Sequence, residues 1–157
     1  MEVPNDLQPG EAVLVSACLL GEETRYDGGH KKTPALVDAL HQAGLRIISV
    51  CPEVLGGLPT PRPAASLEKG GASAVWGASA RVRTKEPPAD VTGEFINGAR
   101  AVLEMAKAEG ARYAFFQERS PSCGSLQTNM EGALVDGPGV TSALLFAEGI
   151  QVIAINA

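Results

Sequence analysis

The chain has few aromatic residues and no excess of positive charge. Phe, Trp and Tyr together make up 4% of its 157 residues, and the formal net charge is -5 at pH 7. Proteins that bind single-stranded nucleic acid stack bases on aromatic side chains, and a surface that follows a phosphate backbone needs clustered Lys and Arg. Both shortages count against a nucleic-acid-binding protein. We expect a small, compact substrate instead.

Long apolar stretches are also missing. No segment approaches the roughly 18 apolar residues that a membrane helix needs. The first residues, MEVPNDLQPGE, lack the basic and then apolar pattern of a secretory signal. We therefore expect a cytoplasmic protein without a membrane partner, whose oligomeric state the sequence does not indicate.

Short apolar segments that read as strands alternate with amphipathic segments that read as helices. Strands are expected at 12–20, 45–50, 111–116 and 150–155, and helices at 34–43, 91–109 and 139–149. Each helix supplies the crossover that a parallel neighbouring strand requires. The pattern predicts an α/β fold with a mostly parallel sheet, a Rossmann-like three-layer αβα arrangement. One domain is expected over residues 1–157, with 1–11 as an N-terminal tail.

Two details of this pattern are less regular. Residues 64–90 show no clear period, and we expect one or two short strands on a flap there. Thr92 is expected to cap the start of the helix at 91–109, and Gly110 to end it.

The only three cysteines lie near the ends of three of the expected strands or just beyond them. Cys18 lies near the end of the first strand, Cys51 directly follows the second, and Cys123 lies in the loop SPSCGS after the third. An odd number of cysteines cannot pair completely within one chain, and a reducing compartment disfavours disulfides. Because the carboxyl ends of parallel strands meet at one edge of a sheet, where ligands bind, the three thiols are expected to gather at a shared site. The alternative is that each is a small buried hydrophobic residue.

The chemistry of three thiolates leaves two kinds of centre open. They suit zinc with an open fourth position, or a cubane iron–sulfur cluster in which one iron has no protein ligand. A soft, all-sulfur donor set favours either of these over magnesium or calcium. His30 lies in a polar loop and His41 in a helix, and both are better explained as solvated surface residues than as ligands.

Around these cysteines the sequence resembles the bacterial thiouracil desulfurase family. The matching motifs, in order, are VSACLLGEETRYDGG (15–29), CPEVLGGLPTPRPAA (51–65), DVTGEFINGA (90–99), ERSPSCG (118–124) and GPGVTSALL (137–145). They span nearly the whole chain beyond the first dozen residues. The resemblance implies an enzyme that removes sulfur, without net redox change, from thiouracil or a thiolated uridine nucleotide.

The resemblance also implies a cofactor and a catalytic pair. The cofactor would be a [4Fe-4S] cluster held by Cys18, Cys51 and Cys123, with an open iron that accepts the substrate sulfur while water attack leaves a carbonyl. Glu53 and Ser120 match the catalytic pair proposed for the family. From the residues alone, Glu53 is either a general base or a carboxylate at a helix N-terminus. Ser120 would orient water or substrate, or bond to its own backbone, the role that we assign to Ser122.

Four further residues are expected to line the same crevice and bind substrate. Arg62, in the rigid segment PTPRP, would clamp a phosphate or a pyrimidine carbonyl through paired hydrogen bonds. Arg25, Tyr26 and Asp27 lie in the loop after the first strand. A surface ion pair between Arg25 and Asp27 is the alternative.

The sequence departs from the family pattern in three places. Gln117 stands where a lysine often precedes ERSPSCG, Ser66 stands where a glutamate is frequent, and LQTNMEG follows Cys123 in place of a YDG-like turn. These differences concern the substrate pocket more than the cysteines.

Two other functions use the same thiols. The protein would be a non-catalytic cluster carrier or redox sensor if the Glu53 carboxylate had no role in a reaction. It would be a zinc or thiol enzyme if Cys51 or Cys123 were a nucleophile.

Overall fold

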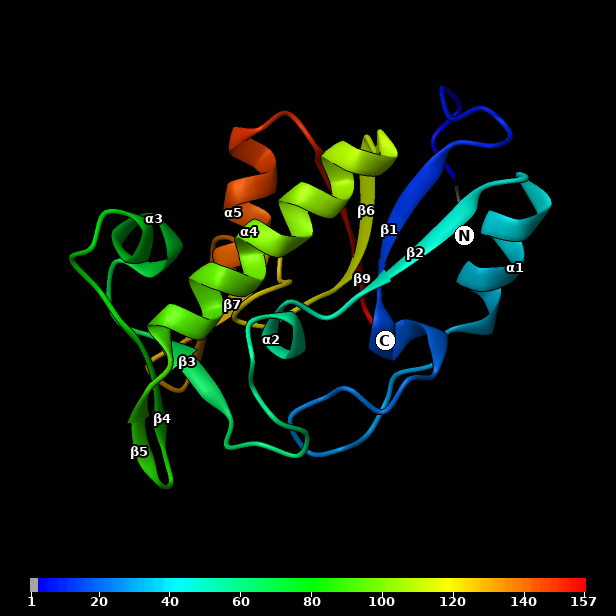
Figure 1. The fold of residues 1–157 in the computed structure, drawn as a ribbon. Helices are drawn as coiled ribbons and strands as arrows, with labels where there is room; N and C mark the ends of the chain where they lie inside the picture. The colour runs from blue at the N-terminus through cyan, green and yellow to red at the C-terminus, as the bar shows by residue number, and fades with distance from the viewer. Residues whose placement is uncertain (1–2) are drawn as a thin grey trace.

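A four-stranded parallel sheet forms the centre of the molecule. The computed structural model describes residues 3–157. The strands are β1 (Ala12–Ser16), β2 (Arg46–Val50), β6 (Tyr113–Gln117) and β9 (Gln151–Ile155). Their order is β2-β1-β6-β9, and every neighbouring pair is parallel (Figure 1). The predicted α/β fold with a mostly parallel sheet is confirmed.

Helices cover both faces of this sheet and make three layers (Figure 1). The three main helices are α1 (Pro34–Gln42), α4 (Thr92–Glu109) and α5 (Val140–Ala147). Successive residues of a strand point to opposite faces. Val13 accordingly packs in one core with Leu36 of α1, whereas Leu14 packs in another with Val102 of α4 and Leu145 of α5. No helix of the described chain is long and apolar enough to cross a membrane.

A second sheet flanks the first and was only partly predicted. Its order is β5-β4-β3-β7-β8, and all neighbouring pairs are antiparallel except β3 with β7. The strands are β3 (Ala65–Leu67), β4 (Val82–Lys85), β5 (Pro88–Asp90), β7 (Gln127–Met130) and β8 (Ala133–Asp136). The flap at 64–90 thus contains three strands and a short helix, α3 (Gly71–Trp76), and the β7–β8 hairpin was missed. Strands of three or four residues are too short to show a period.

The residues before β1, expected to be a tail, pack against the parallel sheet. Positions 1 and 2 lie outside the described residues. Leu7 is buried in the core on the α1 side. The Tyr113 hydroxyl donates to Asp6 at 2.7 Å, and Arg112 pairs with Asp6 and Glu11, each at 2.9 Å. Tyr113 of β6 and Arg112, which precedes it, therefore hold this segment in place.

Helix α4 ends as predicted but begins differently. Gly110 adopts the left-handed conformation that terminates the helix, with φ 67°. Thr92 is not the cap, because Val91 occupies that position. The Thr92 hydroxyl instead donates to Asp90 at 2.7 Å and accepts from the Val82 amide at 2.8 Å, so that it joins the helix to the second sheet.

Two glycines bring α2 (Pro52–Leu55) into direct backbone contact with α4. A Cβ atom on Gly56 would overlap the carbonyl oxygen of Glu94, and one on Gly98 would overlap that of Pro52. Such contact is possible only where both residues lack a side chain. The position of α2, which begins directly after Cys51, therefore depends on these glycines.

We expect Gly98→Ala to lower the free energy of unfolding by about 1–3 kcal/mol, because the added methyl group overpacks the contact between the two helices. Gly93 provides a matched control on the same helix. It is exposed, and a Cβ there would meet nothing within 4 Å. Gly93→Ala should raise the free energy of unfolding by about 0.5–1 kcal/mol. If urea denaturation gave the same change in the free energy of unfolding for both variants, the close contact between α2 and α4 would be contradicted.

Candidate functional site

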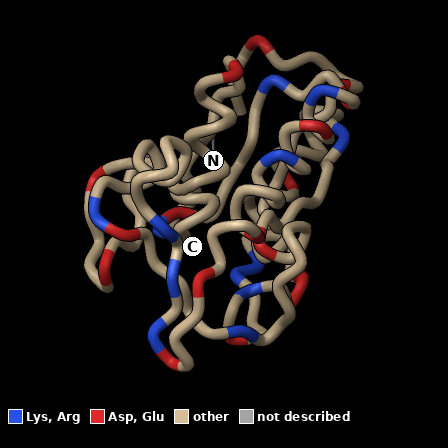
Figure 2. The backbone as a smooth tube through the Cα atoms, turned by 60° about the vertical axis from the view of Figure 1, so that its left-hand side comes forward, with Lys and Arg blue, Asp and Glu red and all other residues tan. Residues whose placement is uncertain are grey.

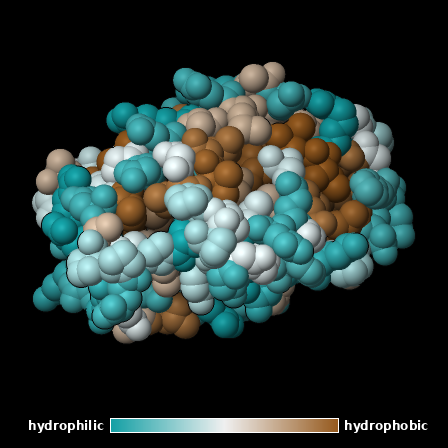
Figure 3. Space-filling view, turned by 60° about the horizontal axis from the view of Figure 1, so that its bottom comes forward, coloured by the Kyte–Doolittle hydropathy of each residue, from teal (hydrophilic) through white to brown (hydrophobic). Residues whose placement is uncertain are grey.

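The carboxyl ends of β1, β2 and β6 surround one pocket. β1 lies between β2 and β6, so the chain leaves β1 toward one side first and returns to its other side later. Such switch points are where open α/β sheets bind ligands. The pocket has a volume of about 220 Å³ and is lined by residues that follow all three strands. With the bottom of Figure 1 turned forward, the visible surface shows apolar residues gathered between hydrophilic borders (Figure 3).

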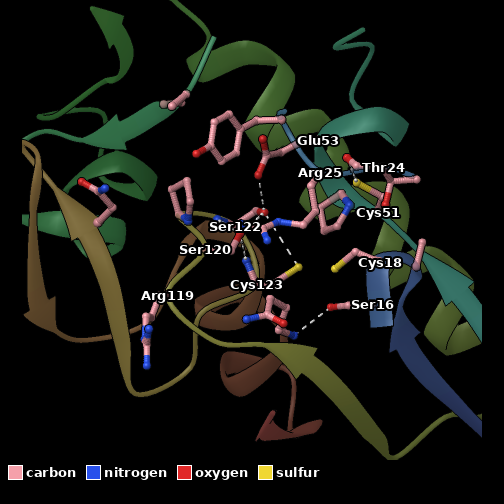
Figure 4. A pocket seen from close by; sticks show the side chains of 18 of the residues that line it. Ser16, Cys18, Thr24, Arg25, Cys51, Glu53, Arg119, Ser120, Ser122 and Cys123 are labelled. Carbon is pink, nitrogen blue, oxygen red and sulfur yellow. Dashed lines mark hydrogen bonds between the residues drawn. The ribbon is translucent and has the colours of Figure 1, made fainter. Parts of the chain in front are cut away.

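All three cysteines line this pocket. Cys18 lies in the short 3-10 helix η1 (Ala17–Leu20) that follows β1, Cys51 lies between β2 and α2, and Cys123 lies in the loop after β6. The three thiols are free. Figure 4 shows the sulfur atoms of Cys18 and Cys123 facing each other, with Cys51 beside Thr24. Residues far apart in sequence are therefore brought together by the parallel order of the strands.

Burial keeps two of these thiols protonated at neutral pH. It raises the pKa of Cys18 to about 11, and the neighbouring Cys51 adds to the shift. Burial, followed by Cys51, also raises the pKa of Cys123 far above its usual range. A thiolate is the nucleophile in cysteine catalysis, so these shifts count against Cys123 as an unassisted nucleophile. Metal ligation would instead displace both protons.

The donor set fits an iron–sulfur cluster better than a single ion. No group of three His, Cys, Asp or Glu side chains in the described chain is placed to hold one metal ion. A cluster separates its protein ligands by several bonds, and three sulfur ligands without a nearby imidazole suit a [4Fe-4S] centre with one open iron. The pocket is also many times larger than the space that one water molecule needs.

Glu53 is held at the pocket wall by a buried ion pair. Arg62 Nε donates to Glu53 Oε1 at 3.0 Å, and the two side chains are only 4% and 12% exposed, respectively. The guanidinium also donates to the carbonyls of Thr24, at 2.9 Å, and Pro59, at 3.2 Å. Arg62 therefore ties Glu53 to the loop after β1. Both residues line the pocket, and a direct contact of Arg62 with substrate stays a prediction.

Ser122 connects the two residues that were predicted to be catalytic. A carboxylate only accepts, so the Ser122 hydroxyl donates to Glu53 Oε2 at 3.0 Å. Ser120 Oγ lies 3.0 Å from Ser122 Oγ, which has already used its proton, so Ser120 is the donor there. The hydroxyl of Ser120 also accepts from the backbone amides of Ser122, at 3.2 Å, and Cys123, at 3.1 Å. The result is a directed chain from Ser120 through Ser122 to Glu53 (Figure 4).

The role of Ser122 differs from the turn residue that we predicted. It is buried and contacts a carboxylate 69 positions away in the chain. Serine beside proline usually bonds its own backbone, and here Ser120 does so while Ser122 does not. Only the packing of the 118–124 loop against α2 distinguishes the two, and local sequence carries no signal for it.

Glu118 organises the loop that carries these groups and was not predicted to do so. Its buried carboxylate accepts hydrogen bonds from the backbone amides of Ser125, at 2.7 Å, Leu126, at 3.1 Å, and Arg119, at 3.2 Å. A carboxylate bonded to several amides is a strong local clamp. It closes the loop around Cys123. In the sequence, the position of Glu118 at the start of the ERSPSCG motif could have indicated this role.

The residues of the first loop divide into two groups. Arg25 and Tyr26 line the pocket, and the guanidinium carbon of Arg25 lies 5.9 Å from the centre of the Tyr26 ring. Asp27 is not among the residues lining the pocket, and its carboxylate accepts from the Gly29 amide at 2.9 Å. Arg25 and Asp27 both lie in the described part of the chain, and they do not form the alternative ion pair. Substrate binding by these three residues stays a prediction.

The fold and the site define a Rossmann-like α/β protein with three free cysteines gathered beside a buried carboxylate–serine network at the switch point of its sheet. The model of the 2-thiouracil desulfurase family matches residues 13–157. The chain belongs to this family.

Two relatives extend the comparison over most of the chain. The solved structure of a [4Fe-4S]-dependent thiouracil desulfidase, TudS, is 44% identical and superposes with a TM-score of 0.77. The match covers 92% of this chain and 90% of that structure. The protein YbbK of Bacillus subtilis strain 168, described as uncharacterised, is 38% identical over 150 residues, which is 92% of this chain and 95% of YbbK.

Proposed function

We propose that this protein is a [4Fe-4S]-dependent desulfurase that converts thiouracil or a thiolated uridine nucleotide to the corresponding carbonyl compound. One water is consumed and one hydrogen sulfide is released, so no external electron donor is required. The single observation that carries the proposal is the convergence of three free cysteines with the Ser120–Ser122–Glu53 chain in one pocket.

The three cysteines are the ligands in this proposal. Cys18, Cys51 and Cys123 would hold the cluster, and its remaining iron would supply a soft Lewis acid for the thiocarbonyl sulfur. Cys51 is the least buried of the three, and Cys18 and Cys123 lie in the two cores. The cysteines would thus hold the cofactor at the pocket that all three line.

Glu53 is the proton acceptor for the attacking water. Its carboxylate borders the pocket, and Arg62 and Ser122 fix both of its oxygens. A general base needs this restraint, because proton transfer requires the acceptor within hydrogen-bond reach of the water. Ser120, at the other end of the chain of hydroxyls, would hold Ser122 in position through the hydrogen bond that it donates. Ser122 links Ser120 to Glu53, because its hydroxyl is hydrogen-bonded to both side chains.

The network favours an enzyme over a cluster carrier or sensor. Taking a carboxylate and a guanidinium out of water is costly, and the pair between Glu53 and Arg62 is almost fully buried. A carrier needs ligands and an accessible cluster but no buried base. The proposal is tested by anaerobic reconstitution, followed by assay of sulfide and uracil from 2-thiouracil. An intact cluster that turns over no thiopyrimidine would reject it.

Ser122→Ala is expected to lower the rate of sulfide release by about 10- to 100-fold, because it breaks the link between Ser120 and Glu53. Iron content should not change. Ser125→Ala is a matched control in the same loop, since the Ser125 hydroxyl is buried and has no hydrogen-bond partner. Its removal should leave activity and stability nearly unchanged. Similar rates of sulfide release for the two variants would show that the hydrogen bonds of Ser122 to Ser120 and Glu53 have no role in the reaction.

A further inference from the structure

Three arginines of the described chain line the pocket, and they differ in what their guanidinium groups face. The guanidinium of Arg62 is occupied by the Glu53 carboxylate and by backbone carbonyls. Arg119 is exposed, and Figure 4 shows its side chain pointing away from the cysteines. Arg25 is half-buried, and its side chain extends into the pocket (Figure 4). Arg25 is therefore the arginine that a small ligand in the pocket can reach.

The Arg25 guanidinium has no anionic partner within residues 3–157. It forms no ion pair or side-chain hydrogen bond there, and the adjacent carboxylate of Asp27 accepts from the Gly29 amide instead, at 2.9 Å. The Tyr26 ring lies 5.9 Å from the guanidinium carbon, which favours the cation without using its N–H donors. In a chain of net charge -5, Arg25 thus brings an uncompensated positive charge to the pocket.

This charge acts on the cysteines. Burial, followed by the neighbouring Cys51, raises the pKa of Cys18 to about 11, and the positive charge of Arg25 counteracts both. Electrostatic attraction weakens with distance, so this influence agrees with a guanidinium on the cysteine side of the pocket. Figure 4 shows the Cys18 and Cys123 sulfur atoms facing each other there. The free donors of Arg25 are therefore available where the sulfur chemistry of the proposed function would take place.

We propose that the Arg25 guanidinium binds the substrate's sulfur as it leaves as hydrosulfide, an inference that rests on the proposed function. In this hydrolysis the oxygen of water bonds to the thiocarbonyl carbon, the C–S bond breaks, and its electrons stay on sulfur. The water gives up both protons. One reaches the sulfur, which departs as HS⁻, and the other is left on Glu53 until it passes to solvent. No atom changes its oxidation state through an external donor.

A guanidinium suits this role for two reasons. Negative charge develops on the sulfur during the reaction, and a fixed positive group aimed at such a charge stabilises the transition state. A guanidinium is also weakly hydrated and spreads its charge over a plane, so that it can leave water for a large, polarisable anion. Ligation would turn the three thiols into thiolates, which repel a departing anion. The predicted role of Arg25 in substrate binding is thereby narrowed to the sulfur atom.

The test is titration of the anaerobically reconstituted holoprotein with sodium hydrosulfide in the absence of any thiopyrimidine, followed by the absorbance of the cluster. Arg25→Gln should bind hydrosulfide about 10- to 100-fold more weakly than the wild type, because a hydrogen bond between charged groups is lost. Arg119→Gln is the matched control. It removes the same charge from the same pocket wall, but its guanidinium is exposed and screened, so its affinity should stay within about threefold of the wild type.

Three results would overturn the inference. The first is wild-type affinity for hydrosulfide in Arg25→Gln. The second is an equal loss in both variants, which would assign the effect to the overall charge of the pocket. The third is an Arg25→Gln protein that takes up no iron, which would make Arg25 part of cluster binding instead. Since its side chain forms no hydrogen bond, the iron content of Arg25→Gln should match that of the wild type.

The proposed function is scored separately, by sulfide release from 2-thiouracil by the wild-type protein. A protein that releases sulfide but binds hydrosulfide equally well with and without Arg25 retains the function and loses this contact. One that binds hydrosulfide through Arg25 but turns over no thiopyrimidine retains the contact and loses the function.

Discussion

A Cys51→Ser variant is expected to lose the iron–sulfur absorbance and to release sulfide at least about 100-fold more slowly than the wild type. Serine keeps the shape of the side chain but offers a hard oxygen in place of a soft sulfur, which iron–sulfur clusters disfavour. Two cysteines would then hold a cluster that needs three. The measurements are iron and acid-labile sulfide per chain and the rate of sulfide release.

The stability of the apoprotein provides the control for this change. The Cys51 sulfur makes only a weak contact, 3.8 Å from the Thr24 carbonyl oxygen, so the urea midpoint of apo Cys51→Ser should match that of the apo wild type. Retention of about four irons and of activity in Cys51→Ser would remove Cys51 from the ligand set. One zinc per wild-type chain, without labile sulfide, would support the zinc enzyme instead.

The second large effect is expected from Glu53→Gln, which should slow sulfide release by about 10²–10⁴-fold while leaving the cluster in place. The amide retains the shape and can still accept from Ser122, but it cannot take a proton from water. The change also leaves the Arg62 guanidinium buried without its countercharge, which typically costs about 3–5 kcal/mol. Activity must therefore be measured at a temperature at which circular dichroism shows the variant to be folded.

The same substitution elsewhere separates catalysis from the loss of a charge. Glu68 pairs with Arg83 at 2.9 Å, but both side chains are well exposed. An exposed ion pair contributes little to stability, because water and salt screen it. Glu68→Gln should therefore alter neither activity nor stability appreciably. A Glu53→Gln protein that keeps its cluster and the wild-type rate would favour the carrier or sensor over the enzyme.

Charged residues of both signs are spread over the molecule (Figure 2). Lys and Arg are interspersed with Asp and Glu. Many of them form exposed pairs, such as Arg81 with Asp90 at 2.8 Å and Lys107 with Glu148 at 3.2 Å. The pair between Arg62 and Glu53 differs from these because it is buried at the pocket. Burial, and not the number of ion pairs, marks the site.

The parallel sheet and its helices could be predicted because they repeat local patterns. The helix at 34–43 ends one residue earlier than expected, and the strands at 45–50 and 150–155 each begin one residue later. The first strand was predicted too long, because residues 17–20 are apolar yet form the 3-10 helix that contains Cys18. Apolar composition indicates burial there and does not specify the backbone conformation.

The second sheet depends on pairing between distant segments. Leu67 of β3 pairs with Met130 of β7. Neither strand is long enough to show an alternating pattern in the sequence. The hydrogen bond between Glu53 and Ser122 is also nonlocal, since the two residues meet only when α2 and the 118–124 loop close over the same edge. A prediction based on neighbouring residues identifies candidates but does not show which of two nearby serines faces the carboxylate.

The order of the main helices and the parallel strands, and the location of each cysteine at or beyond the end of a strand, could be derived from the chain alone, because periodicity and chain direction are local properties. Which side chains share the pocket was decided by tertiary packing. The backbone contact of Gly56 and Gly98 positions α2, Arg62 restrains Glu53, and the end of β6 leaves the Gln117 oxygen without a donor. Each of these depends on atoms supplied by another part of the chain, and their positions relative to one another exist only in the folded protein.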